Sequence, residues 1–167
     1  RSAIQAALVD SDLVLLSGGT SKGEGDLNAI VVGELSPGIL VHGVALKPGK
    51  PICLAAEGAK PVVILPGFPT SAIFTFHEFV APLIRDLAGR ARESRETRTA
   101  QLAIKTQSER GRLEYLLVGL VEDQGGRLSA YPMGKGSGSV TSFSRADGFV
   151  RIGRNTEQVE ADSEVEV

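Results

Sequence analysis

The sequence predicts an α/β fold in two parts, an α/β domain over residues 1–90 and a small β-domain over residues 91–167. In the first part, short apolar runs, glycine turns and segments of helical period follow one another. That order is typical of a layered α/β domain with a mostly parallel sheet. In the second part, short alternating segments are separated by stretches rich in glycine and serine. Such segments indicate strands that close or form a sandwich, which protects their edges.

Glycine and proline bound the elements expected in the first part. After a helix-like opening segment, we expect strands at residues 12–16, 43–46, 52–55 and 62–65, and helices at residues 27–35 and 70–87. Pro37-Gly38 stops the first of these helices. Pro82 kinks or interrupts the second, and Gly89 is its expected C-cap.

The second part begins after a charged stretch without apolar anchors, residues 90–98. A stretch of this kind marks a solvated boundary between domains. Beyond it we expect strands at residues 100–104, 115–121, 128–131, 149–152 and 165–167. The glycine and serine run at residues 134–139 is either a loop that reaches a bound phosphate or a flexible linker.

Composition narrows the classes of partner. The chain has 42% hydrophobic and 23% charged residues and a formal net charge of -2, so it lacks the broad basic field that attracts nucleic acid or anionic lipid. No apolar run approaches the roughly 18 to 20 residues that span a bilayer. Cys53 is the only cysteine, which rules out an internal disulfide and a cysteine metal cluster. We therefore expect a cytoplasmic protein that binds neither nucleic acid nor membrane.

The first candidate site is the loop Ser17-Gly18-Gly19-Thr20-Ser21-Lys22-Gly23-Glu24-Gly25-Asp26, between a strand and a helix. Its glycines let backbone N–H groups approach an anion, while its hydroxyls and Lys22 add donors and positive charge. It is not a P-loop, because Glu24 and Gly25 stand where that motif requires Lys and Ser or Thr. The loop is therefore either a phosphate cradle or a plain turn with Asp26 as the helix N-cap.

Two further loops suit an anion. Lys47-Pro48-Gly49-Lys50-Pro51 presents two lysines on a stiff turn, which fits a phosphate or an oxyanion such as molybdate, and the alternative is a solvated turn. The segment 65–72 runs from a strand end into a helix start, whose free N–H groups form another anion site. Thr70 or Ser71 can either cap that helix or contact a ligand, and we expect one of them to cap it.

The two histidines and the cysteine point to no catalytic centre. His42 lies near a strand start and His77 among helix aromatics, and neither has an acidic partner at ligand spacing. Cys53 has the surroundings of a small buried hydrophobe. We expect all three to be structural.

In order and spacing, these loops resemble the molybdopterin-binding domain of the MoeA/gephyrin family. The matching segments are Ser17-Gly18-Gly19-Thr20-Ser21 with Gly25-Asp26, His42 through Pro51, and Leu65 through Ala72. Gly136 through Ser139, Ala146-Asp147-Gly148 and the closing valines resemble the C-terminal β-domain of that family. The resemblance implies part of a three-layer molybdopterin-binding α/β domain, followed by a small β-barrel-like domain.

The resemblance also implies an activity, that of a molybdopterin molybdotransferase. Such an enzyme binds adenylated molybdopterin, inserts molybdenum from molybdate and releases AMP, with Mg²⁺ at the phosphates. The implied catalytic residues are Asp26, which also lies near the metal, and Lys47 and Lys50, which hold phosphate or molybdate. The implied binding residues are Gly18, Gly19, Thr20 and Ser21 at the phosphate, Pro66, Gly67, Thr70 and Ser71 at the pterin, and Ser137 or Ser139 from the second domain. By analogy we expect a homodimer.

Three residues depart from the family pattern, and a missing segment leaves a second function open. Lys22 stands where the family has an apolar residue, and Phe68 and Thr70 replace its Asn and Val. The family's earlier strand and helix set, with its own glycine and acid motif, is not in this sequence, so we expect a C-terminal part of a longer enzyme. The alternative is a non-catalytic molybdopterin- or molybdate-binding module, or a scaffold. Retention of the acidic residue and both lysines favours ancestry in a working enzyme.

Overall fold

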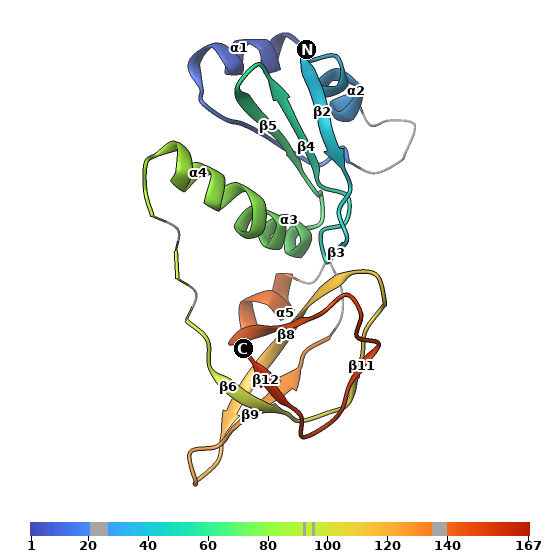
Figure 1. The fold of residues 1–167 in the computed structure, drawn as a ribbon, viewed down its shortest axis with the longest axis vertical. Coiled ribbons are helices and arrows are strands. Elements are labelled where there is room, and N and C mark those ends of the chain that lie inside the picture. The colour runs from blue at the N-terminus through green and yellow to red at the C-terminus, as the bar shows by residue number, and fades with distance from the viewer. Residues whose placement is uncertain (21–26, 92, 95, 135–139) are drawn as a thin grey trace. The chain divides into compact units, whose positions relative to one another are not determined.

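The computed structural model describes residues 1–20, 27–91, 93–94, 96–134 and 140–167, which form two compact units (Figure 1). Unit 1 comprises Arg1–Val44 and Gly49–Glu93, and unit 2 comprises Ala45–Pro48 and Ser94–Val167. Residues 45–48, expected within the first domain, belong to unit 2. The reason is a short strand, β3 (Leu46–Lys47), which pairs in parallel with β8 (Leu113–Glu122) of that unit.

Unit 1 is built around a four-stranded sheet in the order β1-β5-β4-β2. Its elements are α1 (Ser2–Asp10), β1 (Val14–Ser17), α2 (Leu27–Gly33), β2 (Pro37–His42), β4 (Cys53–Glu57), β5 (Lys60–Leu65), α3 (Pro69–Thr75), the π-helical turn η1 (Phe76–Val80) and α4 (Ala81–Leu87). Among the described strands of this sheet, β1 and β5 run parallel, and the other two pairs are antiparallel. The expected mostly parallel sheet is therefore wrong. A tight turn at Gly58 joins β4 to β5, and parallel strands need a long crossover instead.

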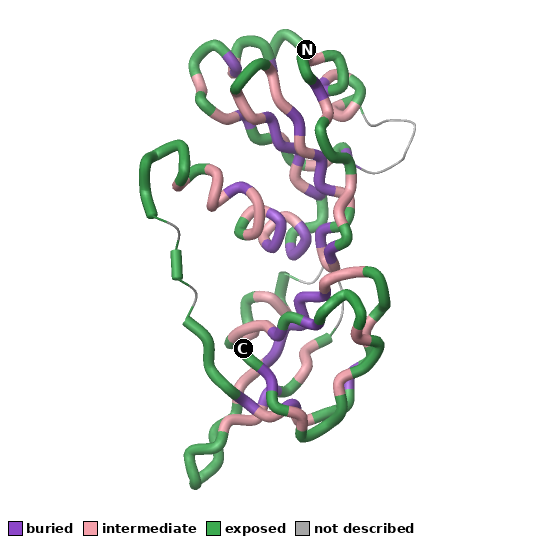
Figure 2. Tube along the Cα trace, viewed as in Figure 1, coloured by how far each residue is buried: buried purple, intermediate pink, exposed green. Residues whose placement is uncertain are grey.

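Helices cover both faces of this sheet. α1 and α2 contribute Ile4, Leu8 and Val32 to one core, together with buried side chains of β1, β4 and β5. On the other face, Val80 at the end of η1 packs with Ile52 and Val63. Neighbouring residues of a strand point to opposite faces, and Figure 2 shows buried positions along the strands of unit 1. The three-layer α/β arrangement is confirmed.

Of the strand expected at residues 43–46, only Leu46 lies in a strand, the two-residue β3, so that expectation is wrong for residues 43–45. The strand of the unit 1 sheet in this region is β2, which ends at His42. Pro37-Gly38, expected only to end a helix, begins the strand. β2 is at the end of the strand order in the described part of unit 1, and an edge strand tolerates a proline because no ladder hydrogen bond is lost there. Gly38 has φ 81°, which glycine adopts without steric cost.

The helix expected at residues 70–87 is divided in the middle. In η1 the turn widens, so that the N–H of Ala81 donates to the oxygen of Phe76, five residues earlier. Pro82 follows in the first turn of α4, where a residue without an amide hydrogen is tolerated. The expected interruption at Pro82 is therefore a π-helical turn.

Gly89 ends α4 as predicted. It has φ 64°, and its N–H donates to the oxygen of Asp86 at 3.1 Å. The next N–H, of Arg90, donates to the oxygen of Arg85 at 2.8 Å. This pair of bonds is the Schellman motif, in which a left-handed glycine satisfies the last helix carbonyls.

Unit 2 is a curled sheet in the order β10-β8-β9-β6-β12. Its remaining elements, besides β3 and β8, are β6 (Thr99–Leu102), β7 (Thr106–Gln107), β9 (Leu128–Pro132), α5 (Val140–Arg145), β10 (Gly148–Ile152), β11 (Gln158–Val159) and β12 (Glu164–Glu166). The outer strands approach each other, because a Cβ atom on Gly148 would lie 2.5 Å from Cγ1 of Val167. The barrel-like β-domain is therefore confirmed as a half-barrel. The two-residue strands and α5 were not predicted, because such short segments carry no periodicity.

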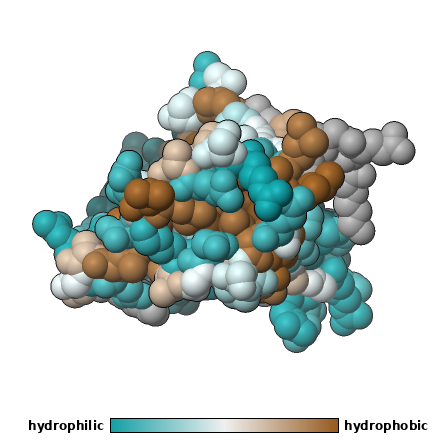
Figure 3. All heavy atoms as spheres, turned by 90° about the horizontal axis from the view of Figure 1, so that it is seen from above, coloured by the Kyte–Doolittle hydropathy of each residue, from teal (hydrophilic) through white to brown (hydrophobic). Residues whose placement is uncertain are grey.

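Two further features concern the helices and the surface of the described residues. In the described parts of the chain, no helix is long and apolar enough to cross a membrane. On the face shown in Figure 3, apolar and polar residues are interspersed.

Candidate anion-binding site

Three loops of unit 1 leave the same edge of its sheet. The strand register places Ser17 of β1 beside Leu65 of β5. It also places Cys53 of β4 beside Ile64 of β5 and His42 of β2. The carboxyl ends of β1, β2 and β5 therefore meet the amino end of β4 at one edge. The sequence loops that follow these ends contain the predicted site residues of unit 1.

The backbones of the first and third loops lie against each other. Gly18 and Gly19 have φ 76° and 75°, and the N–H of Gly18 donates to the oxygen of Leu65 at 2.9 Å. A Cβ atom on Gly67 would lie 3.6 Å from the Cα of Gly18. The structure thus brings together two glycine segments that are far apart in the sequence.

Side chains from two other elements contact the first loop. Nδ2 of Asn28, in α2, donates to the oxygen of Gly18 at 3.1 Å. Nε2 of His42, at the end of β2, lies 3.3 Å from the oxygen of Thr20, and Thr20 is itself buried. Predicted site residues Ser21 and Asp26 lie outside the described residues.

The start of α3 differs from expectation. Its N-cap is Phe68, Pro69 occupies the first turn, and no side chain caps the helix. Capping by Thr70 or Ser71 is therefore wrong, because both residues lie inside the helix, as its second and third residues, whereas a capping residue precedes the first helical position. Thr70 and Ser71 are 2% and 4% exposed. They lie beneath the surface of the loop, as does the fully buried Pro66.

The two predicted lysines belong to different units. Lys50 is exposed in a turn of unit 1, where its oxygen accepts the N–H of Val44 at 2.8 Å. Lys47 is in β3 of unit 2, and its Nζ lies 3.5 Å from Oε1 of the buried Glu114. The other carboxylate oxygen of Glu114 accepts a hydrogen bond from Ser108 Oγ at 2.7 Å. Lys47 therefore already has an anionic partner, whereas Lys50 faces solvent.

Besides Lys47, the site residues that the sequence predicts in unit 2 lie within residues 135–139. Ser137 and Ser139 lie outside the described residues. The neighbouring Ala146-Asp147-Gly148 segment has a structural role. Oδ2 of Asp147 accepts the N–H of Leu120 at 2.8 Å, just beyond the point where the pairing of β10 with β8 ends at Val118.

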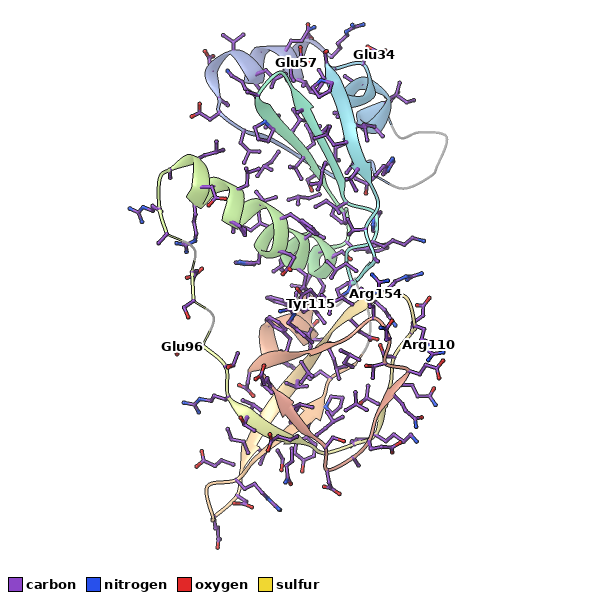
Figure 4. The ribbon with its side chains drawn as sticks, viewed as in Figure 1. Glu34, Glu57, Glu96, Arg110, Tyr115 and Arg154 are labelled. Carbon is purple, nitrogen blue, oxygen red and sulfur yellow. The ribbon has the colours of Figure 1, made fainter. Side chains whose placement is uncertain are left out.

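Among the described residues, the acidic side chains do not form a metal site. No group of three or more His, Cys, Asp or Glu side chains converges within the described residues. Glu34 and Glu57, labelled in Figure 4, lie near the opposite end of the sheet of unit 1, where β2 begins. Asp123 is in the turn after β8, where chiefly the backbone N–H of Arg127 lowers the pKa of its carboxyl. The metal-binding expectation therefore rests on Asp26.

Two residues of interest were not identified from the sequence, and a third was given a different role. Asn28 was not singled out, and His42 was expected to be structural only. Glu114 was also missed, although an acidic residue within the apolar segment 113–118 is itself a signal of a buried ion pair. Such pairs join segments far apart in the chain, so their partners are not visible in local patterns.

The two glycines in contact should respond differently to alanine. We expect Gly18→Ala to destabilise unit 1 by about 1–2 kcal/mol, because a side chain disfavours positive φ. We expect Gly67→Ala to cost less than about 0.5 kcal/mol, because its new methyl would make only an ordinary contact with Gly18 at 3.6 Å. Hydrogen exchange of the β1 and β5 amides in both variants measures the difference. Equal effects would contradict the strain at Gly18.

Both units match models of known protein families. Residues 1–86 match the family model described as "Probable molybdopterin binding domain". Residues 99–167 match the model "MoeA C-terminal region (domain IV)".

Individual relatives align with the whole chain. A molybdopterin biosynthesis protein of Methanocaldococcus jannaschii is 32% identical over 168 residues, which cover 100% of this chain and 38% of the relative. A molybdopterin molybdenumtransferase of Haemophilus influenzae is 28% identical over 169 residues, which cover 100% of this chain and 42% of the relative. A solved MoeA structure from Pyrococcus horikoshii has a TM-score of 0.76 at 39% identity and covers 99% of this chain and 39% of that chain.

The chain spans about two fifths of the length of these relatives. Both of its units have a counterpart in one family, and the fold agrees with the solved MoeA structure. This chain therefore belongs to the MoeA family of molybdenum cofactor biosynthesis proteins and corresponds to its C-terminal part.

Proposed function

We propose that the complete protein in which this sequence occurs inserts molybdenum from molybdate into adenylated molybdopterin and releases AMP. The observation that carries the proposal is the meeting of three motif loops at one edge of the sheet of unit 1. Relatives named molybdopterin molybdenumtransferase support the reaction class. This chain contributes part of the site.

The described loops suit the phosphate end of such a substrate. Gly18 and Gly19 expose backbone at the sheet edge, and the ammonium group of Lys50 is free to approach an anion. Cleavage of a pyrophosphate depends on charge neutralisation and positioning more than on a nucleophilic side chain. Ser21, with Thr20, adds hydroxyl groups in this proposal. The buried Thr70 and Ser71 would shape the pterin pocket, together with the buried Pro66 and the exposed Gly67.

Lys47, Ser137 and Ser139 complete the proposal from unit 2. In the ion pair of Lys47 with Glu114, 35% of the Lys47 side chain is exposed. It can therefore bind a phosphate or molybdate oxygen while Glu114 holds it in place. The two serines contribute hydroxyl donors in this proposal.

Mg²⁺ fits this site only with Asp26 and the substrate. Mg²⁺ is usually held by one or two carboxylates and by substrate phosphate oxygens rather than by a full protein cage. The described residues form no such cage, so Asp26 would be the protein ligand. When bound, the ion would neutralise charge on the pyrophosphate. The homodimer and the cytoplasmic location stay predictions.

One observation favours a second candidate function, a non-catalytic molybdopterin- or molybdate-binding module. Lys47 is engaged with Glu114, which reduces the charge available for the transferred group. A module of this kind would bind adenylated molybdopterin without releasing AMP.

The test compares turnover with binding. In the complete protein supplied with adenylated molybdopterin, Mg²⁺ and molybdate, we expect AMP release, and we expect Asp26→Ala to lower its rate by about 100-fold or more. Asp12→Ala is the matched control, because Asp12 is exposed and precedes β1, away from the loop edge. Binding without AMP release by the unmodified protein would contradict the transferase and support the module.

A further inference from the structure

Two side chains outside the glycine loop hold its carbonyl groups. Asn28 in α2 donates to the oxygen of Gly18, and His42 at the end of β2 contacts the oxygen of Thr20. Because a carbonyl oxygen only accepts hydrogen bonds, Nε2 of His42 carries the proton and donates it. The loop is thereby attached to a helix and to a strand that are both packed in unit 1.

A hydrogen bond to a carbonyl group also fixes the direction of the N–H group in the same peptide unit. The peptide unit is planar, and in the trans form its C=O and N–H point in opposite directions. The oxygen of Gly18 points toward Asn28, so the N–H of Gly19 is turned away from α2. Among the described residues, this N–H has no backbone acceptor. Amides oriented in this way are the donors that bind anions.

The loop needs such anchors because of its composition. Two consecutive glycines, Gly18 and Gly19, adopt positive φ, and glycine loses more conformational freedom on folding than any other residue. Without external hydrogen bonds, the peptide between them would rotate easily. The hydrogen bond from Asn28 to the oxygen of Gly18 restricts that rotation, and the contact of His42 holds the carbonyl group of Thr20 further along the loop.

We propose that Asn28 and His42 are positioning residues, which fix segment 18–20 so that the N–H of Gly19 faces a phosphate of the pterin nucleotide. The identity of this anion rests on the function proposed above. The positioning itself rests only on the two contacts, at 3.1 and 3.3 Å, and on the peptide geometry.

The test uses single substitutions in the complete protein. Asn28→Ala and His42→Ala are each expected to weaken binding of adenylated molybdopterin about fivefold to tenfold, the effect of one hydrogen bond. KM should rise to a similar degree while kcat stays unchanged, because the contact binds ground state and transition state alike. His42→Gln should retain most of the affinity, because its amide can donate to the same oxygen.

Matched controls come from the remaining residues of each type. His77, in η1, and Asn155, beyond β10, are both exposed. We expect His77→Ala and Asn155→Ala to bind as tightly as the unmodified protein. Thermal unfolding of all variants identifies any general loss of the fold.

A second measurement is independent of the ligand. The NMR order parameters of the Gly19 and Thr20 amides in the free protein should fall in both alanine variants, and recover in His42→Gln. If the unmodified protein binds and the alanine variants bind equally well, the positioning role is overturned. Equal losses in His42→Gln and His42→Ala would also overturn it. If the unmodified protein does not bind but the order parameters fall, the proposed function fails and the positioning role stands.

Discussion

Replacement of Lys47 by alanine is expected to destabilise unit 2 by roughly 1–3 kcal/mol, because it removes the cation beside a buried carboxylate. Breaking a fully buried pair costs more, but 35% of the Lys47 side chain is exposed and Ser108 also binds Glu114, which reduces the loss. Lys50→Ala is the control, with an expected change below about 0.5 kcal/mol, because Lys50 is exposed. Hydrogen exchange of the β8 amides reports the stability of unit 2.

A double substitution separates stability from chemistry. Glu114→Gln removes the buried charge, so the variant with both Lys47→Ala and Glu114→Gln should be more stable than Lys47→Ala alone. If Lys47 also binds substrate, AMP release should stay low in the double variant although stability returns. Full recovery of AMP release would contradict a role for Lys47 in binding.

The edge of the unit 1 sheet from which the three motif loops leave could be predicted from the sequence, because its signals are local. Apolar runs ending in Ser17-Gly18-Gly19 and in Leu65-Pro66-Gly67 each predict a strand followed by a turn. These two strands are neighbours in the sheet and run parallel, so their loops meet. Gly89 was predicted for the same reason, since a C-cap depends only on its own turn.

The contacts that stabilise the site could not be predicted in this way. β3 has only two residues, and it joins unit 2 through pairing with β8, far along the chain. The pairing of Lys47 with Glu114 follows from that strand. Asn28 and His42 likewise act on atoms of another segment. Non-local contacts of this kind depend on the completed fold rather than on residue spacing.

Pro37-Gly38 shows how a local signal can be correct and its meaning incomplete. A proline followed by glycine ends a helix, and α2 does end before it, at Gly33. The same residues also begin β2, because an edge strand accepts proline. The position of β2 in turn determines where His42 lies.

Replacement of Gly38 by alanine is expected to be more damaging than replacement of Gly18, Gly58 or Gly67, three other glycines of unit 1. A Cβ atom there would lie 2.8 Å from the oxygen of Leu35 and 3.1 Å from that of Gly33, and Gly38 has φ 81°. Both oxygens are backbone atoms, so the turn between α2 and β2 must shift. We expect a loss of roughly 2–5 kcal/mol from the clash and the strained φ together.

Gly58→Ala separates the two contributions. Gly58 also has positive φ, 57°, but a Cβ atom there would meet no atom within 4 Å. We expect a cost of about 1–2 kcal/mol from φ alone, measured by hydrogen exchange of the β4 amides. A shifted turn at Gly38 would also displace β2, and with it the contact between His42 and Thr20. Gly38→Ala should therefore lower the order parameters of the Gly19 and Thr20 amides, whereas Gly58→Ala should not. Equal loss in both variants would show that the position of β2 does not control the loop.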